Sequence, residues 1–281
     1  MKENIFDWKD YNSWNITFDI FVRELLPKNF DSLIHKNKEE IYCDSAGDLE
    51  YYVRDENDNY FFNSEFRTFI KSNYSHILTY HGCRPLNTES YYEKGLLKLN
   101  VSHQNDNFVN LFLNENFNEV LKEDIDYAIN ETNKERRENQ LFLGLDDREL
   151  IEMSGHYLIY GSEYIVCLAT RLSDRLKRDY QAFLRNHGEP TIFKVKLPIP
   201  DIKDDDLVAL FPILYRVWIY NTLNERNIAC SVDFSFFLKI NINPELIMSH
   251  YHPTKIRDWL NKGSIYISET NSYIFDDLSA V

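Results

Sequence analysis

No apolar run in this sequence approaches the roughly 20 residues that a helix needs to cross a bilayer. The opening residues, MKENIFDWKD, also lack the apolar stretch of a secretory signal. We therefore expect a soluble, cytoplasmic protein that has no membrane-spanning part.

Cysteine is scarce and shows no paired spacing. The chain has four cysteines, none of them in a C-x-x-C arrangement: Cys43, Cys83, Cys167 and Cys230. A disulfide framework or a zinc knuckle would need regularly spaced cysteines, so we expect reduced thiols. The pair His250 and His252, in SHYHP, has no further ligands nearby in the sequence, and we expect no metal.

Positive charge is in short supply. Lys and Arg number 31 against 45 Asp and Glu, which gives a net charge of -14. Because affinity for phosphate comes largely from Lys and Arg, this balance argues against a general nucleic-acid-binding surface. One stretch carries four basic residues: Arg171, Arg175, Lys177 and Arg178. It is either a solvated helix face or a local guide for RNA or DNA, while the acidic balance fits solubility or a basic protein partner.

Three familiar motifs are also missing. The sequence contains no GxxxxGK[ST], no GxGxxG after a strand and no GxSxG. Nucleotide hydrolysis, Rossmann-type redox chemistry and serine hydrolysis therefore lack their usual marks.

The sequence is rich in residues that can form a buried core: of its 281 residues, 43% are hydrophobic and 15% are aromatic. Apolar residues at helical spacing in FDIFVRELL and EFRTFIKSNY predict a helical N-terminal lobe over residues 1–75. The same spacing over residues 114–130 predicts an amphipathic helix inside a helical insertion, about residues 104–150. We expect two more helices, one capped by Ser162 and one formed by LVALFPILYRVWIYNTL.

Four short segments have the composition of strands: HILTY (76–80), HYLIY (156–160), TIFKVKLPI (191–199) and CSVDFSFFLKI (230–240). In the last of them, Asp233 and Ser235 share one face and Phe236 lies on the other. Short strands separated by helices and insertions indicate an α+β fold.

The most informative stretch is HGCRPLNTESYYEKGLL, residues 81–97. It resembles the first NAD+-binding motif of the poly-ADP-ribose polymerase and diphtheria-toxin branch of the ADP-ribosyltransferases. Six positions match in register: His81, Gly82, Arg84, Asn87, Gly95 and Leu96. The resemblance implies that His81 bonds a hydroxyl of the adenosine ribose through a neutral ring nitrogen. Gly82, which has no Cβ, would let the backbone pair with the nicotinamide carboxamide. Arg84 either touches the pyrophosphate or anchors the turn.

A second part of the resemblance lies at Gly155-His156-Tyr157. It is similar to the family's Gly-x-Tyr strand, whose tyrosine packs against nicotinamide, although the gap to the following serine is shorter than in the polymerases. The resemblance implies that Tyr157 stacks on nicotinamide and that Ser162 bonds the carboxamide. Tyr160 and Tyr164 compete with Tyr157 for the stack.

The family's third element is a glutamate on a late strand, which bonds the nicotinamide ribose and steadies the oxocarbenium-like species. The resemblance brings Asp233 to that position, one methylene shorter, and a misplacement of about 1 Å costs on the order of 100-fold in rate. A register slip of two residues would put Ser235 there. Glu163 is another candidate acid, unless it serves only as a carboxylate at a helix N-terminus.

The resemblance as a whole implies a split, mostly antiparallel ADP-ribosyltransferase fold over residues 76–250, with residues 251–281 as a tail packed on it. NAD+ would be the substrate. Because the acid is not the polymerases' glutamate, transfer of a single unit to a protein, RNA or DNA acceptor is favoured over chain building. Proteins of this fold include bacterial and phage-defence toxins, so we expect a toxin or anti-phage effector, with an antitoxin or chaperone as a further partner.

Two alternatives stay open at this point. In an NAD+ glycohydrolase, water would replace the macromolecular acceptor. In an inactive binding module, the fold would be kept to recognise a partner, which the missing glutamate permits.

Overall fold

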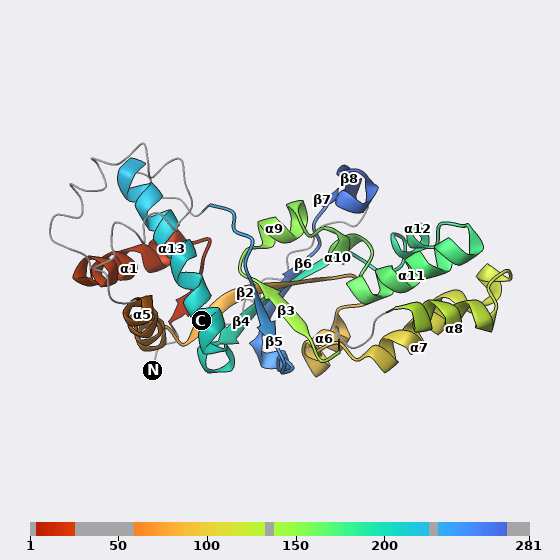
Figure 1. The fold of residues 1–281 in the computed structure, drawn as a ribbon, viewed down its shortest axis with the longest axis horizontal. Coiled ribbons are helices and arrows are strands. Elements are labelled where there is room, and N and C mark those ends of the chain that lie inside the picture. Colours follow the sequence, from red (N-terminus) through yellow and green to blue (C-terminus); the bar gives the residue numbers. More distant parts are fainter. Residues whose placement is uncertain (1–3, 26–58, 133–137, 225–229, 269–281) are drawn as a thin grey trace. The chain divides into compact units, whose positions relative to one another are not determined.

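The computed structural model describes residues 4–25, 59–132, 138–224 and 230–268. Within these ranges, helices accompany a mostly antiparallel sheet, which confirms the predicted α+β class (Figure 1). No helix in these ranges is long and apolar enough to span a membrane.

Contacts along the chain divide it into two compact units. The first unit combines Met1–Leu78 with Lys196–Phe234, and the second combines Thr79–Val195 with Ser235–Val281. The domain boundaries expected after residues 75 and 250 stay predictions. The contact pattern adds a later helix, α13 (Asp204–Asn224), to the unit that contains the N-terminal helices.

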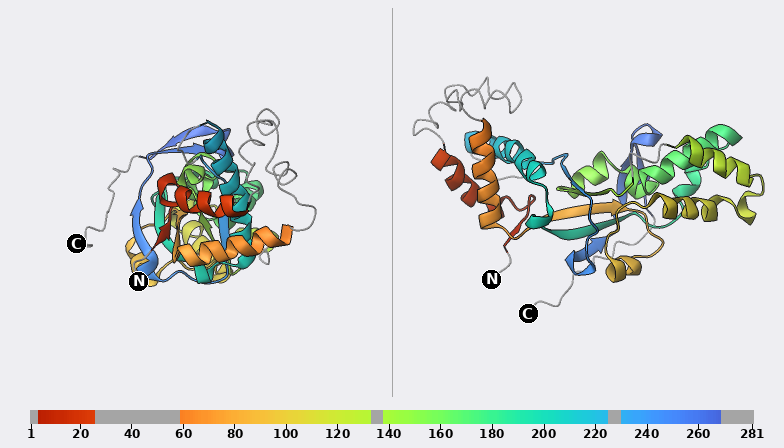
Figure 2. Two further views of the ribbon diagram at one scale, coloured as in Figure 1. Left: turned by 90° about the vertical axis from the view of Figure 1, so that its left-hand side faces the viewer. Right: turned by 60° about the horizontal axis from the view of Figure 1, so that its bottom comes forward.

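Among the described residues of the first unit, three α-helices are present: α1 (Tyr11–Leu25), α5 (Asn59–Asn73) and α13. They lie side by side in both views of the ribbon (Figures 1 and 2). The apolar periodicity of FDIFVRELL, EFRTFIKSNY and LVALFPILYRVWIYNTL had predicted these helices, and the structure confirms them.

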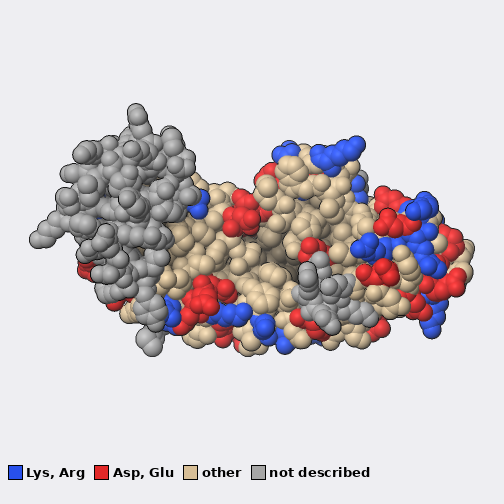
Figure 3. All heavy atoms as spheres, in the orientation of Figure 1, with Lys and Arg blue, Asp and Glu red and all other residues tan. Residues whose placement is uncertain are grey.

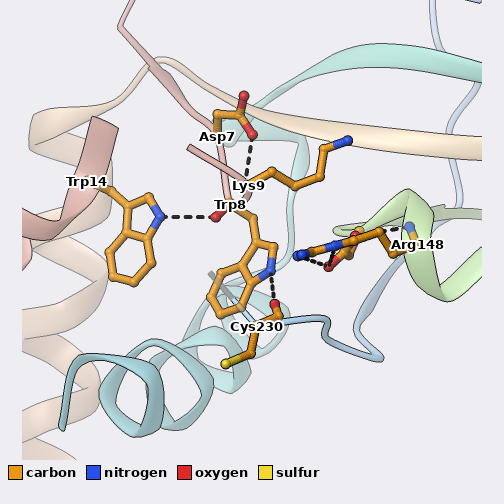
Figure 4. Close-up of polar contacts among 7 residues, drawn as sticks. Asp7, Trp8, Lys9, Trp14, Arg148 and Cys230 are labelled. Carbon is orange, nitrogen blue, oxygen red and sulfur yellow. Dashed lines mark hydrogen bonds and ion pairs between the residues drawn. The ribbon is translucent and has the colours of Figure 1, made fainter. Parts of the chain in front are cut away.

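The core of the first unit is aromatic. Trp14 is fully buried and stacks on Trp8 with ring centroids 5.7 Å apart. The Trp14 indole N–H donates to the carbonyl oxygen of Trp8 at 3.3 Å, and the Trp8 indole donates to that of Cys230 at 3.0 Å (Figure 4). Phe18 and Phe66 meet edge to face at 6.3 Å. Buried rings therefore form most of this core, and each buried indole N–H has an acceptor.

The main sheet contains six strands among the described residues: β1 (Ile5–Phe6), β2 (His76–Cys83), β3 (Leu141–Gly144), β4 (Thr191–Pro198), β5 (Ser235–Leu238) and β6 (Ile247–Tyr251). The order across the sheet is β5-β3-β2-β4-β6, and β1 adds to β2 in parallel. The strands predicted from HILTY and TIFKVKLPI are confirmed as β2 and β4, but β2 continues to Cys83, so His81 and Gly82 lie in the strand instead of in a turn after Tyr80. The central position of β2 explains its run of apolar residues, since Ile77 and Leu78 are both buried although they face opposite sides.

The second unit holds the remaining helices with described bounds: α6 (Glu89–Lys94), α7 (Val101–Phe112), α8 (Lys122–Glu131), α9 (Asp147–Glu152), α10 (His156–Ile159), α11 (Glu163–Leu176) and α12 (Gln181–Leu184). The described residues also form four short 3-10 helices, of which η2 (Ile199–Asp201) belongs to the first unit and the others to the second: η1 (Glu115–Phe117), η3 (Pro244–Leu246) and η4 (Trp259–Asn261). Helices α7, α8 and α11 pack against one another (Figures 1 and 2).

The helix predicted from Ser162 is confirmed as α11. The Ser162 hydroxyl accepts a hydrogen bond from the Ile165 backbone N–H at 3.3 Å, as an N-cap does. The apolar spacing predicts a buried stripe of Ile165, Leu168, Leu172 and Leu176; the first three are buried, and Leu176 is half-buried.

Two strand predictions need correction. HYLIY forms the short helix α10 instead of a strand: the backbone N–H of Ile159 donates to the carbonyl oxygen of Gly155, and that of Tyr160 donates to His156, both at 2.9 Å. CSVDFSFFLKI forms a strand only at Ser235–Leu238. The ladder is short because its partner β3 has four residues, which pair one for one with those of β5. Asp233 therefore lies outside the strand on which it was expected.

The predicted helical insertion is also modified. The single helix expected over residues 114–130 is split into η1 and α8, and the Asp124 side chain accepts from the backbone N–H of Leu121 where α8 begins. The insertion also contains a strand that the periodicity did not predict, β3, because four residues are too few to show alternation.

The segment expected to be a C-terminal tail contains a hairpin. Its strands β7 (Lys255–Asp258) and β8 (Ser264–Ile267) pair in antiparallel fashion around η4. Residues 269–281 lie outside the described ranges.

Candidate functional site

The candidate site is built around His81, near the end of β2. Its Nδ1 lies 3.0 Å from the carbonyl oxygen of Phe142 on β3. A carbonyl only accepts, so Nδ1 carries the proton and Nε2 of the neutral ring is an acceptor. Burial lowers the pKa of His81 and outweighs the Phe142 hydrogen bond, which acts to raise it. The ring is therefore neutral near pH 7. Within the described ranges, Nε2 has no hydrogen-bond partner.

Gly82 follows His81 where β2 runs past the short helices. A Cβ at this position would lie 3.2 Å from Cδ2 of Leu158 on α10 and 3.6 Å from the side chain of Leu150 on α9. The absence of a side chain therefore allows β2 to pass close to these two leucines.

Arg84 is held by the protein at nearly every donor. Its guanidinium donates to the carbonyl oxygens of Leu158 at 3.0 Å, His187 at 3.2 Å and Arg185, and it lies 3.2 Å from the Tyr266 hydroxyl. The first three partners are backbone groups of loops and helix ends. Of the two roles expected for Arg84, this geometry favours anchoring the turn over contacting a pyrophosphate.

The three tyrosines that compete for the nicotinamide stack differ in burial. Tyr160 is 6% exposed and donates to Asp258 at 2.8 Å, and Tyr164 is 1% exposed and donates to Asn105 at 2.9 Å. Tyr157 on α10 is only half-buried, and its ring lies against that of His156 at 4.1 Å. A ring that stacks on a ligand needs an accessible face, so the structure favours Tyr157.

Ser162 and Glu163 lie at the start of α11. Because the Ser162 hydroxyl oxygen accepts from Ile165, its proton is free to be donated elsewhere. Glu163 is exposed in the first turn of the helix, the position at which a carboxylate interacts favourably with the helix dipole. Burial lowers the pKa of His156, and the charges of Glu163 and Asp258 oppose that shift. Glu163 is thus electrostatically coupled to the α10 segment.

The two late-strand candidates lie just before β5 and at its first residue. Asp233 is exposed, precedes β5 by two residues and belongs to the first unit, whereas His81 belongs to the second. Ser235, the alternative after a register slip, is exposed at the start of β5, where it is paired with Gly144. Asp233 and His81 are therefore not brought together within one unit.

The structure adds three polar residues that the sequence patterns did not single out: Arg185, Asp258 and Tyr266. Asp258 at the end of β7 is completely buried, accepts from Tyr160 and lies 3.7 Å from a guanidinium nitrogen of Arg185. Tyr266 on β8 donates to the carbonyl oxygen of Arg185 at 3.2 Å, in addition to its contact with Arg84. Neither strand of the hairpin carries a motif, so only the tertiary contacts reveal this cluster.

His250 and His252 are both hydrogen-bonded within the protein. Nδ1 of His250 lies 2.7 Å from the Tyr92 hydroxyl, and Nδ1 of His252 lies 2.9 Å from the carbonyl oxygen of Pro190. The part of the chain that the structure describes contains no group of three His, Cys, Asp or Glu residues suited to a metal ion. These contacts suit a structural role for both histidines.

The basic stretch on α11 fits the solvated-face interpretation. Arg175 pairs with Asp124 of α8, and Arg178 pairs with Glu119. Figure 3 shows Lys and Arg interspersed with Asp and Glu at the end of the molecule where α8 and α11 lie. Acidic side chains therefore lie among the basic ones on the face that Figure 3 shows, which favours a solvated face over a nucleic-acid guide.

No family model, curated protein or solved structure matches this chain. The resemblance to the ADP-ribosyltransferases therefore depends on the motif residues of the sequence alone.

Proposed function

We propose that this protein binds NAD+ and transfers its ADP-ribose to a macromolecular acceptor. The observation that supports this most directly is the protonation of His81. With Nδ1–H held by Phe142, a neutral ring presents Nε2 as an acceptor, which suits the hydroxyl of a ribose. The proposal is also supported by the ring of Tyr157, which is half-buried on α10 and so has a face on which nicotinamide could stack.

The proposed reaction breaks the bond between C1′ of the ribose and the nicotinamide nitrogen. Nicotinamide leaves as a neutral molecule, and positive charge develops on the ribose. A nucleophile of the acceptor then bonds to C1′ and gives up its proton. A carboxylate near the ribose would stabilise the developing charge, and the candidates are Asp233 and Glu163. Ser235 would supply no charge at that position.

The remaining residues take supporting roles in the proposal. Ser162 donates its hydroxyl proton to the nicotinamide carboxamide, and Gly82 offers its backbone to the same group. Arg84 fixes the turn after His81 through the carbonyl oxygens it already bonds.

The test is to add NAD+ labelled in its adenylate part to cell lysate with the wild-type protein, His81→Ala or His103→Ala. His103 is an exposed histidine on α7 and serves as the matched control. We expect labelled macromolecule with the wild type and His103→Ala, and background labelling with His81→Ala. Digestion with protease or nuclease then identifies the acceptor class.

Other outcomes separate the competing functions. Free labelled ADP-ribose without labelled macromolecule would indicate an NAD+ glycohydrolase. Absence of NAD+ turnover with purified protein and with lysate would indicate a binding module. If the protein acts as a toxin or anti-phage effector, with an antitoxin or chaperone as partner, expression of the wild type should arrest growth and expression of His81→Ala should not.

A further inference from the structure

The hairpin formed by β7 and β8 contacts both segments that carry the candidate NAD+ residues. On the β7 side, Asp258 is completely buried, and both of its oxygens are used. Oδ2 accepts from the Tyr160 hydroxyl at 2.8 Å, and Oδ1 accepts from the backbone N–H of Asn261 at 3.1 Å. Burial and the neighbouring Asp258 raise the pKa of Tyr160, so its hydroxyl stays protonated and donates.

On the β8 side, Tyr266 contacts two arginines. Its hydroxyl lies 3.2 Å from Nη2 of Arg84, and its ring lies 5.6 Å from the guanidinium carbon of Arg84 and 5.5 Å from that of Arg185. Arg84 also donates to the carbonyl oxygen of Leu158 on α10. Through Arg84, Tyr266 is therefore linked both to the turn after β2 and to α10.

Backbone packing completes the contact. A Cβ on Gly155 would lie 2.2 Å from the carbonyl oxygen of Arg257, so the start of α10 lies directly against β7. The hairpin therefore holds α10 at both ends, through Gly155 before its first residue and Tyr160 after its last.

We propose that Asp258 and Tyr266 are positioning residues. They set the end of β2, which carries His81, against the segment carrying Tyr157 and Ser162, so that both reach one dinucleotide. This inference rests on the proposed function. In this proposal the hairpin positions the site residues, because each of the two segments is held by a residue that is distant in the sequence. Tyr160 and Asp258 are 98 residues apart, and Arg84 and Tyr266 are 182 apart.

The experiment compares Tyr266→Phe and Asp258→Asn with Ile267→Ala in the full chain. Ile267 lies on the same strand as Tyr266 and is 66% exposed, so its replacement is a matched control within the hairpin. Amide hydrogen exchange is followed over residues 82–88 and 157–162. Affinity is measured with carba-NAD+, whose ribose ring oxygen is replaced by a methylene so that the glycosidic bond stays intact.

We expect faster exchange confined to these two segments in Tyr266→Phe and Asp258→Asn, with Ile267→Ala like the wild type. Affinity for carba-NAD+ should fall about tenfold in Tyr266→Phe, because the hydroxyl that accepts from Arg84 and donates to the carbonyl oxygen of Arg185 is lost. KM for NAD+ should rise with little change in kcat, because a loosened turn weakens ground-state and transition-state binding equally. Tyr266→Ala, which also loses the ring beneath the arginines, should bind more weakly than Tyr266→Phe.

The proposal is overturned if both variants exchange like Ile267→Ala at the two segments. It is also overturned if exchange rises evenly through the second unit, since the hairpin would then only stabilise the fold. Should Asp258→Asn fail to fold, Tyr266→Phe decides the question. A wild type that neither turns over NAD+ nor binds carba-NAD+ would refute the proposed function, and the exchange data would still decide whether the hairpin holds the two segments.

Discussion

Two buried tyrosines, one in each unit, illustrate how differently the two cores are built. Tyr215 in the first unit stacks on Trp218 with ring centroids 5.8 Å apart, and its buried hydroxyl has no hydrogen-bond partner among the described residues. Tyr160 in the second unit donates its hydroxyl to the fully buried Asp258. The first core uses the tyrosine as an apolar ring, whereas the second uses it to satisfy a buried charge.

This difference has a functional meaning. Apolar packing stabilises a fold but tolerates substitutions that keep volume, whereas a buried polar network fixes the orientation of each group in it. Under the proposed function the site has to orient a dinucleotide, which requires the second property. The candidate site lies in the second unit, where the polar network formed by Arg84, Tyr160, Asp258 and Tyr266 is found.

The largest effect on stability should come from emptying the aromatic core. Trp14→Ala removes a fully buried indole that contacts Trp8 and Phe18, and we expect it to lower the free energy of unfolding by about 3–5 kcal/mol. Urea unfolding followed by circular dichroism measures this loss. A loss below about 1 kcal/mol would mean that this packing contributes little, and it would contradict the contrast drawn between the two cores.

Tyr160→Phe should have the next largest effect. The change keeps the ring but removes the donor to Asp258, and we expect a loss of about 1–3 kcal/mol because a buried acceptor is left unsatisfied. Urea unfolding against Asp258→Asn and the double variant measures the coupling between the two side chains. Additive losses would show that the hydroxyl and the carboxylate act independently.

Lower pH should destabilise the second unit selectively. Burial is the largest cause that lowers the pKa values of His81, His156, His187 and His250, all of them in this unit. Between the folded and unfolded pKa values the unfolded chain binds more protons, so stability is greatest above the unfolded pKa near 6.5 and declines as pH falls below it. Amide exchange at pH 7 and pH 5.5, corrected for intrinsic rates, should show the decline in second-unit segments. Equal declines in both units would contradict the assignment to these histidines.

Tyr215→Phe should have the smallest effect and gives the sharpest contrast with Tyr160→Phe. The same chemical change here removes a hydroxyl that has no partner in the described part of the chain, so we expect stability to stay the same or rise by up to about 1 kcal/mol. Thermal unfolding of the two Tyr→Phe variants in parallel tests this. Destabilisation by Tyr215→Phe comparable to that of Tyr160→Phe would show that the two cores do not differ in the way described.

Local signals in the sequence were sufficient where a segment was long or carried a distinct end. Helix α11 was predictable from Ser162 and the spacing of Ile165, Leu168 and Leu172, and β4 from its alternation and flanking prolines. Local signals were insufficient for HYLIY, which forms a helical turn that begins where Gly155 lies against Arg257. They were also insufficient for β3, which is too short to show a period. The same holds for the site: His81, Gly82 and Arg84 form a motif, but their roles as NAD+ ligands stay predictions.

By itself, the sequence determined the α+β class, the long helices and the strand that leads into His81, because periodicity and capping act over a few neighbouring residues. Only the tertiary structure decided that β5 is as short as β3, that Phe142 sets the proton on His81, and that Asp258 and Tyr266 meet Tyr160 and Arg84. These pairs join residues 61 to 182 positions apart, and no local pattern records which distant residues a folded backbone brings together.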